Sequence, residues 1–221
     1  TLVSLSLLVA LRSRGVEVVP FKKGPDYIDA AWLAFAAEQA VCRNLDTFLV
    51  APSVVKQTFV RWAHQAPFSL IEGNRGIYDG KDPAGTHSSA ELAKLLCAPV
   101  VLVVDATKTT RTIAAMVRGC IDFDPHLTIA GIVLNRVAGA RHQRILTESI
   151  HKYCDRPVLG AIPRMDQNQP LIPNRHLGLV TPAEFRPASP LWDQLADIGR
   201  TYLNVDEMVA VGEQAPDLPC D

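Results

Sequence analysis

The strongest constraint on the fold of this chain is the repeated alternation of short apolar runs with longer stretches of helical periodicity. The runs do not alternate with polar residues, so each predicts a strand that is buried on both faces. The helical stretches between them indicate crossovers that join parallel strands. We therefore expect an α/β fold, in which a parallel sheet carries helices on both faces. The predicted strands span residues 16–21, 68–71, 99–104, 128–134 and 157–162, with a further short one at 176–180.

The predicted helices fill the intervals between these strands, and one helix precedes the first strand. They span residues 1–14, 28–39, 53–64, 88–97, 111–120, 141–153, 190–203 and 205–211. Residues 44–46 have the composition of a turn. We expect residues 1–211 to form one domain and residues 212–221, which contain Pro216 and Pro219, to form a linker.

Composition argues against several classes of protein. The residues are 48% hydrophobic and 20% charged, which is typical of a soluble globular domain. A net charge of −1 without a long basic run makes nucleic acid an unexpected partner. The apolar stretches fall short of the roughly 18–20 residues that cross a membrane. The five cysteines are scattered without a CxxC pair, which favours reduced thiols and a cytoplasmic location.

Two stretches carry most of the candidate chemistry, and each directly follows a predicted strand. Residues 21–29 read FKKGPDYID, and residues 71–80 read IEGNRGIYDG. Their acidic side chains therefore lie at the carboxyl ends of strands, where open α/β sheets bind ligands. This mixture of lysines and acids suits Mg²⁺ and phosphate better than a core, although two solvated loops are the alternative. The charged residues are Lys22, Lys23, Asp26, Asp29, Glu72 and Asp79.

Single residues in these stretches each have a structural alternative. Lys22 can reach a phosphate, or it can be a solvated loop lysine. Asp29 can act in the site, or it can favour the dipole at a helix N-terminus. Glu72 directly follows a buried strand, where a carboxylate needs a cation or hydrogen-bond donors. Mg²⁺, which takes one or two carboxylates together with phosphate oxygens, is the natural partner.

Three further polar residues lie at ends of predicted elements. Asp79 precedes Gly80 and can belong to a plain turn. Asp105 ends a predicted strand, where it resembles the metal-shell acid of nucleotide hydrolases or serves as a helix N-cap. Asn135 also ends a strand, and its amide carries a donor and an acceptor that suit the edge of adenine. A turn residue is the alternative for Asn135.

Several strings occur in one order along the chain and together resemble a known family. The set resembles cobyrinic acid a,c-diamide synthase, the ATP-dependent, glutamine-using amidase of corrinoid biosynthesis. The synthetase half of that family belongs with dethiobiotin synthetase among the P-loop NTPases. The resemblance extends over nearly the whole chain and implies a dethiobiotin-synthetase-like fold. Its strings are residues 22–29, 43–46, 72–80, 100–105, 134–137 and 175–179.

The resemblance implies a reaction and a set of site residues. ATP and Mg²⁺ would bind at the strand ends, and the γ-phosphate would pass to a side-chain carboxylate of a tetrapyrrole. Ammonia derived from glutamine would then displace phosphate from the acyl phosphate, giving amides at the a and c side chains. A homodimer is compatible with the family, whereas nucleic acid and membrane are not implied. The resemblance implies catalytic roles for Lys22, Asp26, Tyr27, Asp29 and Asp79, cofactor binding by Lys22, Asn135 and Pro163, and metal binding by Glu72 and Thr1.

The chain also departs from the family pattern. The family's phosphate loop, Gly-x-x-x-x-Gly-Lys-Thr-Thr, is expected just before the first helix, and Thr1 aligns with its first threonine. We therefore expect the chain as given to lack the first strand and the phosphate loop, to be short of a central strand, and to bind ATP weakly. The glutamine amidotransferase domain that supplies ammonia is expected beyond the linker.

Two other functions fit parts of the pattern. One is a dethiobiotin-synthetase-like ATP-dependent ligase. The other is a non-catalytic nucleotide switch of the partition-ATPase kind. Such a switch would need neither the acids of residues 26–29 nor the string at residues 175–179.

Overall fold

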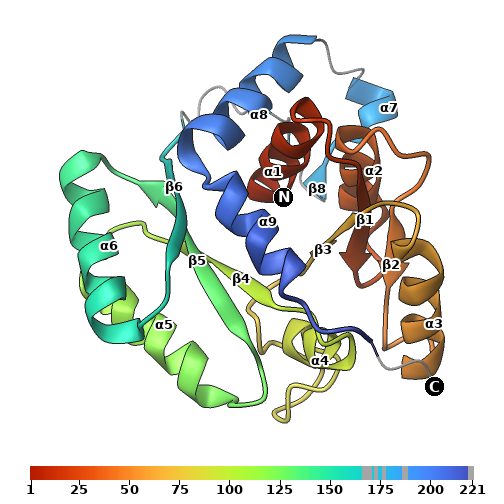
Figure 1. Ribbon diagram of the computed structural model, residues 1–221, viewed down its shortest axis with the longest axis horizontal. Coiled ribbons are helices and arrows are strands. Elements are labelled where there is room, and N and C mark those ends of the chain that lie inside the picture. The colour runs from red at the N-terminus through yellow and green to blue at the C-terminus, as the bar shows by residue number, and fades with distance from the viewer. Residues whose placement is uncertain (166–170, 172–173, 176–177, 186–188, 219–221) are drawn as a thin grey trace.

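Parallel strands flanked by helices form the framework of the chain, as the computed structural model shows (Figure 1). It describes residues 1–165, 171, 174–175, 178–185 and 189–218. One parallel sheet has the order β2-β1-β3, and a second has the order β4-β5-β6. Their strands are β1 (Val18–Lys23), β2 (Arg43–Leu45), β3 (Phe68–Glu72), β4 (Val100–Asp105), β5 (Ile129–Val137) and β6 (Val158–Pro163). A two-residue pair, β7 (Asn174–Arg175) and β8 (Gly178–Leu179), is antiparallel.

Helices cover both sheets. Figure 1 shows α5 and α6 beside the second sheet, and α2 and α3 beside the first. The helices are α1 (Leu2–Ser13), α2 (Tyr27–Ala36), α3 (Pro52–Ala63), α4 (Ser89–Leu95), α5 (Thr112–Phe123), α6 (Ala140–Cys154), α7 (Pro182–Phe185), α8 (Ser189–Tyr202) and α9 (Val205–Glu213). No helix in the described part of the chain is long and apolar enough to span a bilayer.

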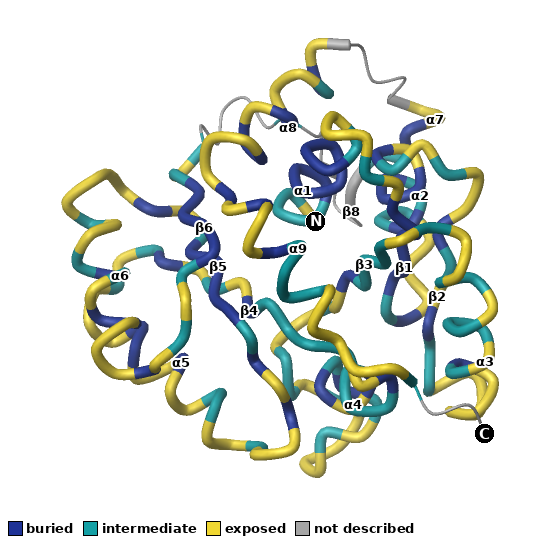
Figure 2. Tube along the Cα trace, viewed as in Figure 1, coloured by how far each residue is buried: buried dark blue, intermediate teal, exposed yellow. Residues whose placement is uncertain are grey.

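The main core lies around α1, which is dark blue along most of its length in Figure 2. Leu5, Leu8 and Leu11 are fully buried, and α8 packs along α1. The closest approach is at Gly199, where a Cβ would lie 2.4 Å from the Ser6 carbonyl oxygen. The first and last thirds of the chain are therefore held together by direct helix packing.

The helix α9 contacts strands of both sheets, β3 and β6. Its approach to β3 is close, because a Cβ at Gly212 would lie 2.2 Å from Cε2 of Phe68. At the other end, the amide of Asn204 donates to the Leu159 carbonyl oxygen of β6 at 2.7 Å. Thus α9 bridges the two sheets, as Figure 1 also shows.

The expected α/β class is confirmed, but the strands form two sheets rather than one. Among the described residues, no ladder joins β3 to β4, so each is hydrogen-bonded to a neighbouring strand on one side only. Val103 in β4 is accordingly 45% exposed, which is high for a strand of such apolar sequence. The expectation that a central strand is missing stays a prediction.

Some boundaries differ from the sequence-based expectation. The predicted turn at residues 44–46 is wrong, because Arg43–Leu45 form β2 and pair in parallel with Phe21–Lys23. Lys22, Lys23 and Glu72 lie within strands rather than after them. Of the strand predicted at 176–180, β8 covers Gly178–Leu179, whereas residues 176–177 lie outside the described part.

Candidate functional site

Three loops meet at the carboxyl edge of the first sheet. The loop after β1 contains Gly24, whose φ of +79° suits glycine and whose Cβ, if present, would lie 3.1 Å from Asn74 Nδ2 in the loop after β3. The side chain of Asn44 in β2 donates to the carbonyl oxygens of Gly24 and Asp26 at 2.6 and 3.0 Å. The sheet therefore fixes the loop that leads to Asp29 from two sides.

A buried lysine lies at this edge between two acids. The parallel register places Lys22 beside Glu72, and Lys22 Nζ lies 3.2 Å from Glu72 Oε1 and 3.9 Å from Asp29 Oδ2. Nζ also donates to the Gly73 carbonyl oxygen at 2.7 Å. The side chains of Lys22 and Glu72 are only 3% and 8% exposed. A buried charge needs such partners, because desolvation is otherwise costly.

Thr1 completes what we call the Lys22 cluster, which consists of Thr1, Lys22, Asp29 and Glu72. Its hydroxyl donates to Asp29 Oδ2 at 2.9 Å and lies 3.4 Å from Glu72 Oε1. Thr1 is the N-cap position of α1, so the positive end of that helix dipole is directed at the cluster. The cluster thus combines two carboxylates, one ammonium and one helix N-terminus, a setting that attracts anions and cations together.

The two carboxylates of the cluster differ in their electrostatics. Glu72 has the nearer positive charge, since Lys22 Nζ lies 3.2 Å from Glu72 Oε1 but 3.9 Å from Asp29 Oδ2. Burial, together with the nearby Glu72 carboxylate, raises the pKa of Asp29. A carboxyl group whose pKa is raised by burial and by a neighbouring carboxylate is common at functional sites.

The donor set of the cluster fits a divalent hard cation. Glu72 Oε2 is buried and has no hydrogen-bond partner in the described part of the chain. The available donors are carboxylate and hydroxyl oxygens, which Mg²⁺ prefers. Because the described residues contain no group of three or more His, Cys, Asp or Glu that could hold a metal, coordination would be completed by water or ligand oxygens. Mg²⁺ is commonly bound in that way.

The predicted residues at the start of α2 have different environments. Asp26 is the N-cap, and its Oδ1 accepts from the amides of Ile28 and Asp29 at 2.9 and 3.0 Å. The capping acid is therefore Asp26, whereas Asp29 extends into the Lys22 cluster. Tyr27 is 71% exposed at the first helical position. Catalytic roles for Asp26 and Tyr27 stay predictions.

Asp79 is not joined to the Lys22 cluster by any hydrogen bond or ion pair of the described residues. Its Oδ2 accepts from the Gly76 amide at 2.9 Å, which closes a turn in the loop after β3. The same carboxylate fills the space beside Gly76, where a Cβ would lie 2.6 Å from it. Asp79 is thus seen to act as a turn residue, and its catalytic role stays a prediction.

The remaining predicted residues lie at the carboxyl edge of the second sheet. Asn135 pairs with Asp105 in the register of β5 and β4, and its Oδ1 accepts from the amide of Arg136 at 2.9 Å. The Arg136 guanidinium lies 3.0 Å from Asp105 Oδ2. Pro163 ends β6 opposite Val137. In the described part of the chain, no hydrogen bond or ion pair connects this group to the Lys22 cluster.

Two histidines that the sequence analysis did not select join loops at the carboxyl edges of the sheets. His87 Nδ1 lies 3.0 Å from the Thr47 hydroxyl, which joins the loops after β3 and β2. His142 Nδ1 accepts from the Ala138 amide at 3.0 Å, and Nε2 lies 2.5 Å from the Thr109 carbonyl oxygen. The contacts from His87 to Thr47 and from His142 to Thr109 span 40 and 33 residues of sequence, so no spacing pattern could have identified them.

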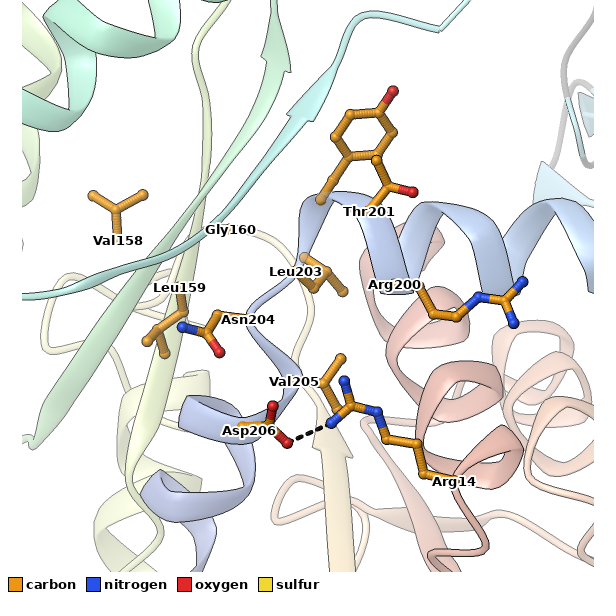
Figure 3. Close-up of a pocket in the computed structure, with 11 residues that line it drawn as sticks. Arg14, Val158, Leu159, Gly160, Arg200, Thr201, Leu203, Asn204, Val205 and Asp206 are labelled. Atoms are coloured by element: carbon orange, nitrogen blue, oxygen red, sulfur yellow. Dashed lines mark hydrogen bonds and ion pairs between the residues drawn. The ribbon is translucent and has the colours of Figure 1, made fainter.

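A hollow of about 410 Å³ lies elsewhere, between β6, the end of α1 and the α8–α9 junction. Figure 3 shows Arg14 beside Asp206 at its rim, and their side chains form an ion pair at 2.5 Å. Arg200 is paired in turn with Asp197. The hollow is lined by the first half of β6 rather than its carboxyl end. It therefore holds none of the predicted site residues.

Comparison with known proteins gives consistent results. Residues 1–177 match the family model described as CobQ/CobB/MinD/ParA nucleotide binding domain. Over 218 residues, 99% of this chain and 46% of the relative, the chain is 43% identical to a cobyrinate a,c-diamide synthase of Magnetococcus marinus. It is 44% identical over 185 residues, 83% of this chain, to a hydrogenobyrinate a,c-diamide synthase of Streptomyces coelicolor, of which it covers 37%. The chain thus spans about half or less of the curated relatives it matches.

Solved structures show a similar fold at low sequence identity. The MinC:MinD cell division protein complex of Aquifex aeolicus matches with a TM-score of 0.51 and 12% identity, covering 99% of this chain and 92% of that one. The chloroplast FtsY of Physcomitrella patens matches with a TM-score of 0.50 and 15% identity, covering 75% of this chain and 56% of that one. These likenesses concern the fold alone, and they agree with the parallel α/β arrangement of this chain.

Proposed function

Because the chain belongs to the CobQ/CobB/MinD/ParA nucleotide binding domain family, we propose that it forms the ATP- and substrate-binding part of an a,c-diamide synthase that acts on cobyrinate or a related tetrapyrrole. The names of the relatives support this choice of substrate. In the complete protein the reaction is the ATP-dependent amidation of two side-chain carboxylates. We place it in the cytoplasm.

The observation that carries the proposal is the Lys22 cluster. It sets a buried ammonium, two carboxylates and a helix N-terminus at the carboxyl edge of a parallel sheet. Ligands of open α/β sheets bind at that edge. Phosphoryl transfer depends mainly on positioning and charge neutralisation, for which a buried lysine and a helix N-terminus are suited.

The proposed chemistry has two steps. A carboxylate oxygen of the tetrapyrrole takes the γ-phosphoryl group of ATP, and ADP leaves. Ammonia then attacks the carbonyl carbon of the resulting acyl phosphate, phosphate leaves, and ammonia loses a proton as the amide forms. Ammonia comes from glutamine in this proposal, through a part of the protein outside this chain.

The residues of this chain have separate tasks in the proposal. Lys22 neutralises phosphate charge, and Asp29 orients the substrate carboxylate or the incoming ammonia. Asp26 fixes the start of α2 and thereby the position of Asp29, because its side chain bonds the Asp29 amide. Glu72 and the Thr1 hydroxyl hold Mg²⁺, which supplies charge neutralisation on phosphate oxygens when bound. Asn135 contacts the adenine, with Pro163 at the neighbouring strand end.

The test uses the complete protein, with cobyrinate, ATP, Mg²⁺ and either glutamine or ammonia as substrates. We expect ADP release coupled to amide formation in the parent protein, and loss of both in Glu72→Gln. Asp122→Asn is the control, since Asp122 is a 53% exposed acid that pairs with Arg118 on α5. Undiminished turnover in Glu72→Gln would contradict the proposal that Glu72 binds Mg²⁺. Failure of the parent protein to amidate any tetrapyrrole would contradict the proposed function itself.

A further inference from the structure

An exposed apolar surface follows the end of β2. Every residue of the stretch 48–54 is exposed, although its sequence, FLVAPSV, is apolar apart from one serine. We call its four largest apolar residues the Phe48 surface. Contiguous exposed apolar residues of this kind mark binding sites in soluble proteins. The members are Phe48, Leu49, Val50 and Val54, which are 59%, 65%, 44% and 46% exposed.

The Phe48 surface lies beside the loop that leads to Asp29. The last residue of β2, Leu45, accepts from the Gly24 amide at 3.0 Å, and its neighbour Asn44 bonds the carbonyl oxygens of Gly24 and Asp26. The chain then reaches Phe48 within three residues of Leu45. A ligand that contacts both Asp29 and the Phe48 surface would therefore lie over the carboxyl edge of β1 and β2.

Several contacts hold this surface in shape. Asp46 accepts from the Phe48 amide through Oδ1 at 2.8 Å and from the Val50 amide through its carbonyl oxygen at 3.2 Å. His87 packs edge-on to the Phe48 ring, with centroids 5.6 Å apart. The surface is therefore preformed, so a ligand would bind without first ordering the loop.

One positive charge lies at the Phe48 surface, and Lys23 lies opposite Leu45, three residues before Phe48, in the ladder of β1 and β2. Lys81 Nζ lies 5.1 Å from the centre of the Phe48 ring. Burial lowers the pKa of Lys23, and the positive charges of Lys22 and Arg75 act in the same direction, whereas Asp46 opposes them. In the described part of the chain, Lys23, Arg75 and Lys81 form no ion pair, so their charges are available to an anionic ligand.

Two buried acceptor atoms without hydrogen-bond partners lie in the loops that follow β2 and β3. Asp46 Oδ2, after β2, and Asn74 Oδ1, after β3, are buried and accept no hydrogen bond from the described residues. Buried polar groups are normally paired, so two such atoms at one edge indicate that a ligand or water completes the site. This observation is independent of the exposed apolar residues.

From these observations we infer that the Phe48 surface binds the flat apolar ring of the tetrapyrrole, while Lys81, Arg75 and Lys23 pair with carboxylates on its periphery. The inference rests on the proposed function and adds the surface that recognises the body of the substrate. A second copy of the chain is a poorer occupant, because two-fold pairing through this surface would bring the same cations together.

The experiment measures binding of cobyrinate to the complete protein by absorbance titration without ATP, together with the KM values for cobyrinate and for ATP. In Phe48→Ala we expect the dissociation constant and the KM for cobyrinate to rise roughly tenfold, with the KM for ATP unchanged. The matched control is Phe123→Ala on α5, because Phe123 is 74% exposed and also loses one ring contact, to Tyr78. This control should bind cobyrinate like the parent protein.

The contribution of positive charge to cobyrinate binding is tested with a second variant and its own control. Lys81→Gln should weaken cobyrinate binding severalfold and flatten its dependence on salt, because one cation is lost beside the ligand. Lys152→Gln is the control, since Lys152 Nζ likewise lies 5.5 Å from an aromatic ring, that of Tyr153 on α6. Lys152→Gln should leave both the affinity for cobyrinate and its dependence on salt unchanged.

The outcomes separate this inference from the proposed function. Weakened cobyrinate binding in Phe48→Ala supports the inference even if the complete protein forms no amide. Unchanged binding in Phe48→Ala and Lys81→Gln would overturn it, even where amidation proceeds. Conversion of a dimer to a monomer by Leu49→Ser, with unchanged cobyrinate binding, would also overturn it and would assign the surface to contact between copies.

Discussion

At the scale of the residue, the Lys22 cluster illustrates what the sequence could and could not predict. The residue types and their place at strand ends identified Lys22, Asp29 and Glu72 as candidates. Their contacts depend on the register of β1 and β3, which sets Lys22 beside Glu72. No local pattern encodes that register, so the burial of Lys22 inside a strand was not foreseen. Asp29 lies in the cluster as predicted, whereas the contacts observed for the Asp26 side chain are the capping bonds to Ile28 and Asp29.

Asp29 gives a prediction about stability. Burial and the neighbouring Glu72 raise its pKa above the ordinary value of 3.8. A raised native pKa contributes stability below the unfolded value, and this stability is lost as the pH rises through the native pKa. Asp29→Asn removes the unfavourable charge, so we expect the variant to be the more stable protein at pH 7, with the difference shrinking towards pH 4.

The measurement is the melting temperature of both proteins between pH 4 and pH 7. For a chain of this size, 1 kcal/mol corresponds to about 2–4 °C. A variant that melts below the parent protein at pH 7 would show that the pairing of Asp29 with Lys22 outweighs its burial and its repulsion from Glu72. In the complete enzyme the same variant should lose turnover, which would separate function from stability at this position.

At the scale of the element, most strands and helices followed from the sequence because their apolar runs are long and uninterrupted. The exceptions are the short elements β7, α7 and β2. The strand β2 contains only three residues, and its sequence resembles a turn. Its strand conformation comes from parallel pairing with β1, a tertiary contact that local composition does not reveal. The missed strand matters for the site, because Asn44 and Leu45 of β2 hold the loop that carries Gly24 and Asp26.

The N-cap of α2 gives a prediction at this scale. Asp26→Ala removes the acceptor for two backbone amides, so it should cost about 0.5–2 kcal/mol of folding free energy. Asp26→Asn keeps a capping oxygen and should leave the stability nearly unchanged. Urea unfolding of the three proteins gives the comparison.

The same pair of variants tests whether the carboxylate has a chemical role beyond capping. If Asp26 only positions α2, Asp26→Asn in the complete enzyme should keep its turnover. A large fall in turnover with unchanged stability would assign the Asp26 charge to the reaction itself.

At the scale of the whole molecule, α9 is one of the helices that join the two sheets. Its packing against Phe68 depends on Gly212, a residue that no sequence pattern singles out. The sequence predicted a helix at 205–211 correctly in position, but not that this helix contacts both β3 and β6. Long-range contacts of this kind require the three-dimensional arrangement.

Gly212→Ala is therefore expected to destabilise the whole molecule. The new Cβ would lie 2.2 Å from the Phe68 ring, and such overpacking typically costs about 1–3 kcal/mol. Gly119→Ala on α5 is the matched control, because a Cβ there meets nothing within 4 Å. That control should be neutral or stabilising by up to about 1 kcal/mol. Equal stability of the two variants in urea would show that α9 does not need close contact with β3.

The one-sided pairing of β3 and β4 has a consequence for how the chain behaves in concentrated solution. The segment Val100–Asp105 reads VVLVVD, with high β-propensity, no proline and a single charge at its end. A strand of this composition with an uncovered edge is a template for stacking into cross-β fibrils. Natural proteins protect such strands with charged residues that act as gatekeepers. A lysine introduced at the exposed Val103 would supply one, and preparations of the isolated chain would then stay free of fibrils at higher concentration.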